Sequence, residues 1–388
     1  MPKRGALPRI CWNLPEVFQL PTVIQAALGF LLLIGPLVVL HELGHYLVAR
    51  WCGVKADVFS MGFGKELLGW TDRRGTRWRV AAIPLGGYVQ FAGDAGASSE
   101  PDPDKLAAMT EAERAQTFAV KPLWQRALIV AAGPVMNLLV AFAIFTAFHI
   151  AFPVLNSPPV VGKIMAGSPA EQVGLRAGDR VLTVDSNRID QFSDISKLVA
   201  AYPGRTVNLH IRRGGGEIDV PVTLATAVER DKFGNEMKLG RIGIAPAEAV
   251  LVRLGPIDAA ALAGRDCWNI TTMIAVNLKQ IITGERSIRE MGGPVKTAKY
   301  SGEMLGEGWL DFTFFAALIS INLAFINLLP IPTLDGGHLA FYAAEAIRRR
   351  PMGARSQDWA FRTGLAFVLA LMLFVTINDL ASLLPFGS

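Results

Sequence analysis

The sequence predicts a multi-pass α-helical membrane protein with about four transmembrane helices, a membrane-associated β-hairpin and an inserted small α/β domain. Of its 388 residues, 51% are hydrophobic and only 18% are charged, and the mean hydropathy is positive. Four apolar stretches are also long enough to cross a hydrocarbon core of about 30 Å, which requires roughly 20 helical residues. These stretches cover residues 22–49, 123–152, 312–334 and 359–384.

The charge balance and the cysteines limit the kinds of partner and metal ligand. The basic residues behind the net charge of +5 are scattered or lie beside apolar spans, without an aromatic-basic stripe of the kind that binds nucleic acid. Anionic lipid headgroups account better for this charge. Cys11, Cys52 and Cys267 are widely spaced, so they predict neither a disulfide framework nor a thiolate metal site. Any metal ligands would have to be His and carboxylate.

The first apolar stretch contains His41-Glu42-Leu43-Gly44-His45. Ionisable side chains inside a span are costly and usually functional. Residues four apart share one helix face, so His41 and His45 can bind one zinc ion with Glu42 beside them. The stretch is too long for a signal peptide and lacks a small-x-small cleavage site, so we expect it to be retained.

Between the first two spans the sequence predicts a β-hairpin. Strand-forming residues at 78–89 follow the glycines of Gly62-Phe63-Gly64 and contain the turn glycines Gly86-Gly87. Residues 93–118 are rich in Asp, Glu, Ser, Ala and Pro, which predicts a solvated and partly flexible loop.

A different composition begins near residue 156, where short Val/Ile/Leu strands alternate with Gly, Pro and Asp turns. Ser168-Pro169-Ala170, the turn Gly178-Asp179 and the strand 207–211 resemble a bacterial PDZ domain, which we assign to residues 156–228. PDZ domains bind extended peptides or C-termini by strand addition. A spacer or steric plug is the alternative role.

Residues 250–300 carry apolar side chains at helical spacing, including Trp268 and Met273, interrupted by charges and by Gly292-Gly293-Pro294. The pattern predicts amphipathic helices on the membrane surface, with ordinary packing beneath the PDZ domain as the alternative. The predicted organisation is an N-terminal membrane part with two spans, the PDZ domain, a linker with surface helices and a C-terminal membrane part with two spans. Their bounds are 1–155, 156–228, 229–310 and 311–388.

Basic residues beside the spans predict the orientation, since cytoplasmic loops are enriched in Lys and Arg. One basic group follows the third span and another lies in the loop after the first: Arg348, Arg349, Arg350, Arg355 and Arg362, and Arg50, Lys55, Arg73, Arg74, Arg77, Arg79, Lys121 and Arg126. Both regions should be cytoplasmic, which places the PDZ domain and both termini outside. Lys3, Arg4 and Arg9 favour the opposite side for the N-terminus, but the two larger groups outweigh this short tail.

Asp335 is the expected third metal ligand. Spans one and three run in the same direction, so the two histidines and Asp335, each late in its span, should reach a similar depth on the cytoplasmic side. Pro330 and Pro332 break the third span just before Asp335, and irregular backbone at membrane depth implies a polar pocket. His338 is the alternative ligand, and Asp335 could instead cap a helix or bond to Asn327.

Together these motifs resemble the site-2 proteases, the intramembrane zinc metalloprotease family, of the bacterial regulator-of-sigma-E protease type with a single PDZ domain. His41 to His45 match the zinc and base motif, and Asn327 to Gly336 match the motif N-x-x-P-x-P-x-L-D-G. Three more segments resemble the membrane-associated β-loop, the start of the second span and the segment before the third: Gly86-Gly87-Tyr88, Gly133 to Asn137, and Gly292-Gly293-Pro294. Some relatives carry two PDZ domains, whereas the insert here has room for one.

The resemblance implies a zinc metalloendopeptidase of the bacterial inner membrane that cuts within the transmembrane segment of single-pass proteins. The implied substrates are an anti-sigma factor already shortened by another protease, in the sigma-factor stress response, or remnant signal peptides. His41, His45 and Asp335 would bind Zn²⁺, and Glu42 would move the proton of the attacking water to the leaving amine.

The resemblance also implies residues that bind the substrate. The strand edge at Gly86, Gly87 and Tyr88 would pair with an unwound substrate. Asn322 and Asn327 would hold the substrate backbone, with interhelical hydrogen bonding as the alternative role of both asparagines.

Two other classes of function remain as alternatives. One is a non-catalytic membrane scaffold whose PDZ domain collects partners, against which Glu42 argues, because a scaffold needs no buried base. The other is a metal transporter, which would usually show polar residues repeated across several spans. His149 and His210 are assigned no chemistry.

Overall fold

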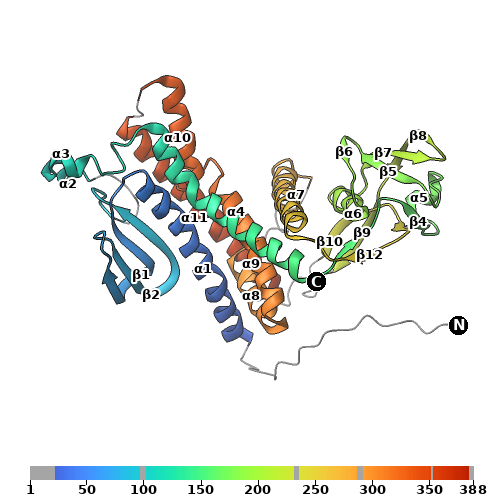
Figure 1. The fold of residues 1–388 in the computed structure, drawn as a ribbon, viewed down its shortest axis with the longest axis horizontal. Helices are drawn as coiled ribbons and strands as arrows, with labels where there is room; N and C mark the ends of the chain where they lie inside the picture. Colours follow the sequence, from blue (N-terminus) through green and yellow to red (C-terminus); the bar gives the residue numbers. More distant parts are fainter. Residues whose placement is uncertain (1–21, 97–101, 231–235, 286–291, 351–352, 384–388) are drawn as a thin grey trace.

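The computed structural model describes residues 22–96, 102–230, 236–285, 292–350 and 353–383. Lys3, Arg4, Arg9 and Cys11 lie outside the described residues. Figure 1 shows a helical part with the sheet of β1 and β2 on one side and a small β-rich part at the other end, beyond α7. The inserted segment is therefore spatially separate from the sheet that follows the first helix.

Four helices are long and apolar enough to cross a membrane. They are α1 (Thr22–Trp51), α4 (Leu123–Ala151), α9 (Trp309–Asn327) and α11 (Ala354–Leu383), in the last of which the apolar segment is Trp359–Leu380. Helix α4 packs against both α1 and α9, so it is the centre of the helical part. This agrees with the expected multi-pass helical protein.

The third helix is shorter than the predicted span 312–334. Helix α9 ends at Asn327, and residues 328–334 form turns that contain Pro330 and Pro332. A new helix, α10 (Asp335–Arg348), begins at the carboxylate residue. Proline lacks the backbone N–H and clashes with the preceding turn, which explains why the helix stops there.

Strands β1 (Ala56–Thr71) and β2 (Arg77–Phe91) form the predicted hairpin, but in a folded-over form. The first half of β1 lies between the two halves of β2, with Phe59 opposite Val89 on one side and Trp78 on the other. The rings of Phe59 and Trp78 pack with Tyr46 of α1, which fixes the sheet on the helix that carries the histidines.

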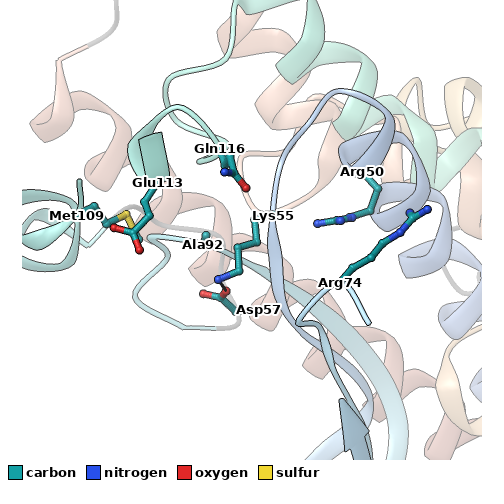
Figure 2. Close-up of a pocket in the computed structure, with 8 residues that line it drawn as sticks. All are labelled: Arg50, Lys55, Asp57, Arg74, Ala92, Met109, Glu113 and Gln116. Atoms are coloured by element: carbon teal, nitrogen blue, oxygen red, sulfur yellow. Dashed lines mark ion pairs between the residues drawn. The ribbon is translucent and has the colours of Figure 1, made fainter. Parts of the chain in front are cut away.

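The described part of the predicted loop 93–118 contains two short helices with exposed side chains. These are α2 (Pro103–Ala108), capped by Asp102, and α3 (Glu111–Arg114), which has a capping box between Thr110 and Glu113. Figure 2 shows Glu113 facing a pocket that Lys55 and Arg50 also border.

The insert is built around a four-stranded sheet with the order β6-β5-β7-β8. Its other elements are two short helices, a strand pair β4–β11 and a hairpin β9–β10, and the pair β3–β12 joins it to the helical part. The predicted boundary at residue 228 lies inside β9, and Ile242 still belongs to the buried core of the insert. The bounds are β3 Val154–Asn156, β4 Val161–Ile164, α5 Pro169–Gln172, β5 Arg180–Val184, β6 Asn187–Arg188, α6 Phe192–Ala200, β7 Thr206–Arg213, β8 Gly216–Thr223, β9 Ala225–Arg230, β10 Glu236–Arg241, β11 Ile244–Pro246 and β12 Val250–Val252.

The described residues of the segment 250–300 include α7 (Pro256–Ile282) and the start of α8 (Pro294–Glu307), and both helices pack on the helical part. Helix α7 lies against α4 and α9, and α8 lies against α1 and α9. Gln280 of α7 also donates a hydrogen bond to the carbonyl of Ala201 in the insert. Packing therefore accounts for one face of these helices, while exposed side chains such as Trp268 leave the membrane-surface role as a proposal.

Asp179, in the turn that suggested the PDZ resemblance, is a buried anchor of the insert. Its two carboxylate oxygens accept hydrogen bonds from Nε and Nη2 of Arg213 at 2.7 and 2.6 Å, and the backbone N–H of Arg176 adds a third at 2.7 Å. Burial raises the pKa of Asp179, but the hydrogen bonds lower the pKa by more than burial raises it. The folded pKa of Asp179 is therefore below the ordinary 3.8. The turn before β5 is thereby tied to the end of β7.

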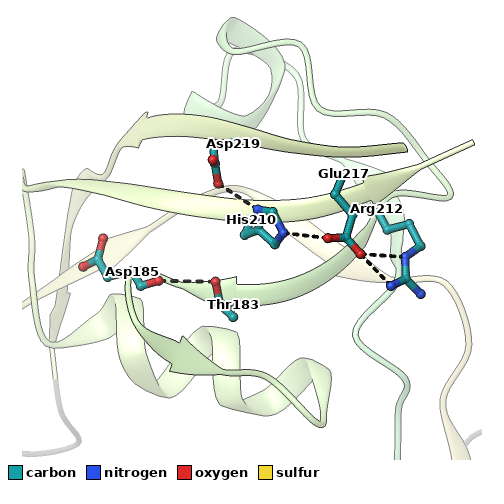
Figure 3. A network of polar contacts seen from close by, with 6 residues as sticks. All are labelled: Thr183, Asp185, His210, Arg212, Glu217 and Asp219. Atoms are coloured by element: carbon teal, nitrogen blue, oxygen red, sulfur yellow. Dashed lines mark hydrogen bonds and ion pairs between the residues drawn. The ribbon is translucent and has the colours of Figure 1, made fainter. Parts of the chain in front are cut away.

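Other charged groups of the insert lie at its surface, and Figure 3 shows the contacts between those of the β7–β8 pair. His210 lies between Asp219 and Glu217, at 2.8 and 3.1 Å, and Arg212 donates to Glu217. All of these residues are exposed or nearly so, and their contacts join neighbouring strands. This network is a surface feature, unlike the Asp179 anchor.

We predict that Asp179→Asn lowers the stability of the insert by roughly 3 kcal/mol at pH 7, because it leaves a buried arginine contact without its charge. Since the folded pKa of Asp179 is depressed, its stabilisation is complete above about pH 4 and is lost as the pH falls through the folded pKa. Hydrogen exchange of the β5 and β7 amides measures this. The difference in amide protection between Asp179→Asn and the wild type should be smaller at pH 3 than at pH 7. Asp219→Asn, at an exposed carboxylate, is the matched control and should change protection little; equal protection in both variants would contradict the anchor.

Candidate metal centre

His41 and His45 lie one helical turn apart on α1, and their Nε2 atoms approach to 3.2 Å. The helix is continuous from Thr22 to Trp51, so the spacing of four residues places both rings on one face, as the sequence predicted. His41 is almost completely buried. Two imidazole nitrogens therefore point to the same spot inside the helical part.

Asp335 reaches the same place from the other end of the chain. Its Oδ2 lies 3.1 Å from Nε2 of His41, and its Oδ1 lies 3.6 Å from Nε2 of His45. Among the described residues, these three make up a group whose ligand atoms all lie within 4.8 Å of one another. Two imidazoles and one carboxylate are a donor set that zinc enzymes use, with a fourth position left for water.

The second nitrogen of His45 has a partner that prepares it for a metal. Its Nδ1 lies 2.8 Å from the carbonyl oxygen of Ile129 on α4. A carbonyl can only accept, so Nδ1 carries the proton and Nε2 keeps its lone pair for a ligand.

Asn137 of α4 is the corresponding partner of His41, provided that its amide oxygen faces Nδ1 of His41. The amide nitrogen lies 3.3 Å from Nδ1 of His41, while the amide oxygen is buried without a hydrogen-bond partner. The two ends of an amide are assigned from their contacts. Turning the amide by 180° lets Nδ1–H of His41 donate to the amide oxygen, which frees Nε2 of His41 for a metal. The residues present therefore fit a zinc ion.

Glycines allow α4 to approach the histidines this closely. A Cβ added at Gly133 would lie 2.2 Å from Nε2 of His45, and one at Gly44 would lie 2.4 Å from the carbonyl oxygen of Ala132. Both distances are shorter than any real contact, so larger residues at either position would push α4 away from α1. Gly133 and Asn137 are four residues apart and thus share the face of α4 that contacts the ligands.

Glu42 lies between the candidate metal ligands and the sheet. Its carboxylate is hydrogen bonded to the backbone of Val89 in β2. A Cβ at Gly87 would lie 3.6 Å from Cγ of Glu42 and 2.7 Å from the carbonyl oxygen of Ser60. The glycine therefore lets the strand pass directly over the acidic side chain.

A cavity of about 930 Å³ opens beside this cluster. Of the predicted site residues it is lined by His41, Glu42, His45, Asp335, Gly87, Tyr88 and Asn327. Gly86 and Asn322 are not among its lining residues, and Gly86 instead makes the bend next to Phe63 with a φ of +91°. His338, the alternative ligand, borders the cavity one turn after Asp335.

A buried ion pair holds α10 against α4. Nη2 of Arg126 lies 3.3 Å from Oε2 of Glu345, and the guanidinium lies 5.0 Å from the ring centre of Tyr342. Because Asp335 is the first residue of α10, this contact fixes the direction from which the carboxylate arrives.

The residues that orient the ligands were the ones that sequence reasoning missed. The position of Asn137 could have indicated its role, since a polar side chain in an apolar span is usually functional. Arg126 and Glu345 gave no such indication, because they are 219 residues apart in sequence.

Comparisons with known proteins agree on one family. Residues 29–371 match the family described as peptidase family M50. A protein of Agrobacterium fabrum and one of Rhizobium meliloti, both named as zinc metalloproteases, are 40% identical over 373 residues and 43% identical over 355 residues. These alignments cover 93% and 90% of this chain and 99% and 95% of the relatives. The metalloprotease MmpA of Caulobacter vibrioides is 35% identical over 376 residues, which cover 91% of this chain and 94% of that protein.

Solved structures also match, and one of them is similar to a part of the chain. The PDZ domain of the SdrC-like protein of Listeria monocytogenes is 23% identical, covers 24% of this chain and 90% of its own, and gives a TM-score of 0.19. A score this low carries no argument about the insert.

We predict that Asn137→Ala weakens zinc binding by about 10- to 100-fold, the usual effect of removing the partner of a ligating histidine. Zinc content after dialysis against a graded chelator measures this. Asn322→Ala is the control, because Asn322 does not line the cavity, and it should keep wild-type zinc affinity. Equal zinc retention in the two variants would contradict the orienting role of Asn137.

We also predict that Glu345→Gln loosens zinc by about tenfold or more, since a broken buried pair leaves Arg126 uncompensated and frees α10. The exchange Arg126→Glu with Glu345→Arg restores the pair in reverse and should recover part of the affinity. Glu111→Gln, at an exposed position, serves as the control. A Glu345→Gln protein that holds zinc like the wild type would show that α10 needs no such contact.

Proposed function

The chain belongs to peptidase family M50, the site-2 protease family, and on this premise we propose that it hydrolyses peptide bonds within the transmembrane segments of single-pass membrane proteins. It is a zinc metalloprotease. The observation that supports the intramembrane site best is the meeting of His41, His45 and Asp335 beside Glu42, on helices of which α1 is apolar enough to span a bilayer.

The proposed roles follow from the contacts of each side chain. His41, His45 and Asp335 would hold the zinc, which would activate a water molecule and polarise the scissile carbonyl. Glu42 takes the proton of the attacking water and delivers it to the leaving amine. The hydrogen bond from the Val89 backbone keeps the Glu42 carboxylate pointed at the cavity. His338 remains the alternative ligand.

The edge of the sheet is the proposed receptor for an unwound substrate. Gly87 and Tyr88 lie in the half of β2 that pairs with β1 on one side only, within the part of the chain that the structure describes. Both residues border the cavity, so an extended substrate added at this edge would cross directly over Glu42. Gly86 contributes the bend, and Asn327 at the end of α9 faces the same cavity. The role of Asn322 rests on the family resemblance alone.

The proposed substrate is a membrane anti-sigma factor that another protease has already shortened, or a remnant signal peptide, in regulated intramembrane proteolysis. The proposed location is the bacterial inner membrane, with the active site toward the cytoplasm and the insert, as a PDZ domain, in the periplasm. The basic residues around α1 and after α10 support this orientation. A periplasmic insert would meet the C-terminus that the earlier cut creates, or exclude bulky substrates. Family membership and the placement of Glu42 favour hydrolysis over the scaffold and the transporter.

We predict that Glu42→Gln lowers the rate of cleavage by about 10² to 10⁴-fold but keeps zinc, because the amide cannot accept the proton yet leaves the three ligands intact. Asp335→Ala should lose zinc and activity together. The measurement is cleavage of a tagged single-pass substrate by purified protein in detergent, with metal analysis of each variant.

The assignment is supported if the wild type cleaves within the apolar segment of the substrate and neither variant does. A Glu42→Gln protein that cuts at the wild-type rate would remove Glu42 as the base. An Asp335→Ala protein that keeps its zinc would move the ligand role to His338, for which His338→Ala is the matching variant.

A further inference from the structure

A second pocket lies at the end of α1, outside the catalytic cavity. It has a volume of about 340 Å³ and is bordered by Arg50, Lys55, Asp57, Arg74, Ala92, Met109, Glu113 and Gln116. Figure 2 shows Arg50 and Arg74 on one side of this pocket and Glu113 with Met109 on the other. None of these residues borders the catalytic cavity, so the pocket is a separate feature.

The two acidic side chains of the pocket already have partners. Asp57 lies 3.5 Å from the ammonium of Lys55, and Glu113 accepts hydrogen bonds from the backbone N–H and the hydroxyl of Thr110 at 3.0 and 2.8 Å. Lys55 therefore balances the charge of Asp57, whereas Thr110 is neutral and holds the Glu113 carboxylate in place without cancelling its charge. Arg50, Lys55 and Arg74 still outnumber Asp57 and Glu113, so the lining is positive by one charge.

The two arginines do not have such partners. Nη1 of Arg50 makes a single 3.4 Å contact with the carbonyl oxygen of Val54, and its Nη2 has no hydrogen bond within the described residues. The guanidinium of Arg74 has no ion-pair partner among the described residues, and only its backbone is used, in the turn closed by Asp72. Two cations thus border one pocket with unused donors, which is the arrangement that binds a phosphate.

The position of the pocket identifies the source of the phosphate. Arg50 is the penultimate residue of a helix apolar enough to cross a membrane, and the next residue, Trp51, is 81% exposed. Arginine and tryptophan at the end of a spanning helix lie at the level of the lipid headgroups. The donors therefore face the layer where lipid phosphates are concentrated.

We propose that the pocket between Arg50 and Arg74 binds the phosphodiester headgroup of an anionic phospholipid. Arg50 contributes from the end of α1 and Arg74 from the turn between β1 and β2. The lipid bridges the metal-bearing helix and the sheet that borders the catalytic cavity. This holds whichever substrate the protease cuts, because neither arginine touches the cavity.

The test is native mass spectrometry of the full-length protein, released from detergent micelles that contain phosphatidylglycerol and phosphatidylcholine in equal amounts. The wild type should retain phosphatidylglycerol preferentially. Arg74→Gln should weaken this retention about five-fold, and Arg50→Gln with Arg74→Gln about 25-fold, since each arginine near the headgroups contributes a factor of about five. Arg73→Gln is the matched control, because Arg73 is in the same turn but does not border the pocket.

Three results would overturn the proposal. They are no preference for phosphatidylglycerol in the wild type, equal retention by the double variant and the wild type, and an equal loss in Arg73→Gln. The same measurement is repeated with millimolar inorganic phosphate added. If this phosphate displaces the lipid, the pocket binds a soluble anion and the proposal is wrong. Zinc content should be unchanged in every variant, which separates this test from that of the protease. Because Arg74 is exposed, its single variant tests the pocket without disturbing the fold.

Discussion

The close approach of α4 to α1 is the constraint on which the metal centre depends. Gly133 faces the ligand nitrogens, and Gly44 faces the α4 backbone at Ala132. Inside a bilayer, helices associate through such small residues because lipid supplies no hydrophobic drive. The same face of α4 then supplies both partners of the imidazoles, the carbonyl of Ile129 and the amide of Asn137. Helix α4 thus orients both histidines of α1, the candidate metal ligands.

The position of Asp335 at the start of α10 depends on a second set of close contacts. A Cβ at Gly336 would lie 2.3 Å from the carbonyl oxygen of Leu328, and one at Gly337 would lie 2.3 Å from that of Ile331. The first turn of α10 therefore folds back on the irregular segment after α9, which only glycine permits. This return aims Asp335 at the histidines, and the Arg126–Glu345 pair then holds the rest of α10 in place. Backbone geometry and a buried charge pair thus together place the carboxylate of Asp335, the third candidate ligand.

Local patterns in the sequence predicted what local geometry determines. The spacing of His41 and His45 is a property of one helix, and Asp335 stands in a motif that proline and glycine define. The family and the zinc chemistry were confirmed by the comparisons. Asn137 is 96 residues from His41, so its contact could not be predicted from helical periodicity.

The packing of the sheet and of α8 was equally beyond the local patterns. The folded-over sheet requires positive φ at Gly62 and Gly86, which the sequence permits but does not specify. Helix α8, expected on the membrane surface, contacts α1 where a Cβ at Gly302 would lie 2.7 Å from the Ala26 backbone. In each case a glycine allows two backbone segments that are distant in sequence to come into close contact. Local sequence patterns do not predict which segments meet in this way.

The order of residues along α1 relates the metal centre to the membrane surface. A helix rises about 1.5 Å per residue, so Arg50 lies about 8 Å beyond His45 and about 14 Å beyond His41 along the axis. With Arg50 at the headgroups, the ligands lie in the nearer half of a hydrocarbon core about 30 Å thick. A peptide bond at that depth belongs to the two or three turns of a substrate helix nearest that membrane surface, where unwinding breaks the fewest backbone hydrogen bonds. The distance from Arg50 to the histidines therefore favours cleavage near the end of the substrate's span.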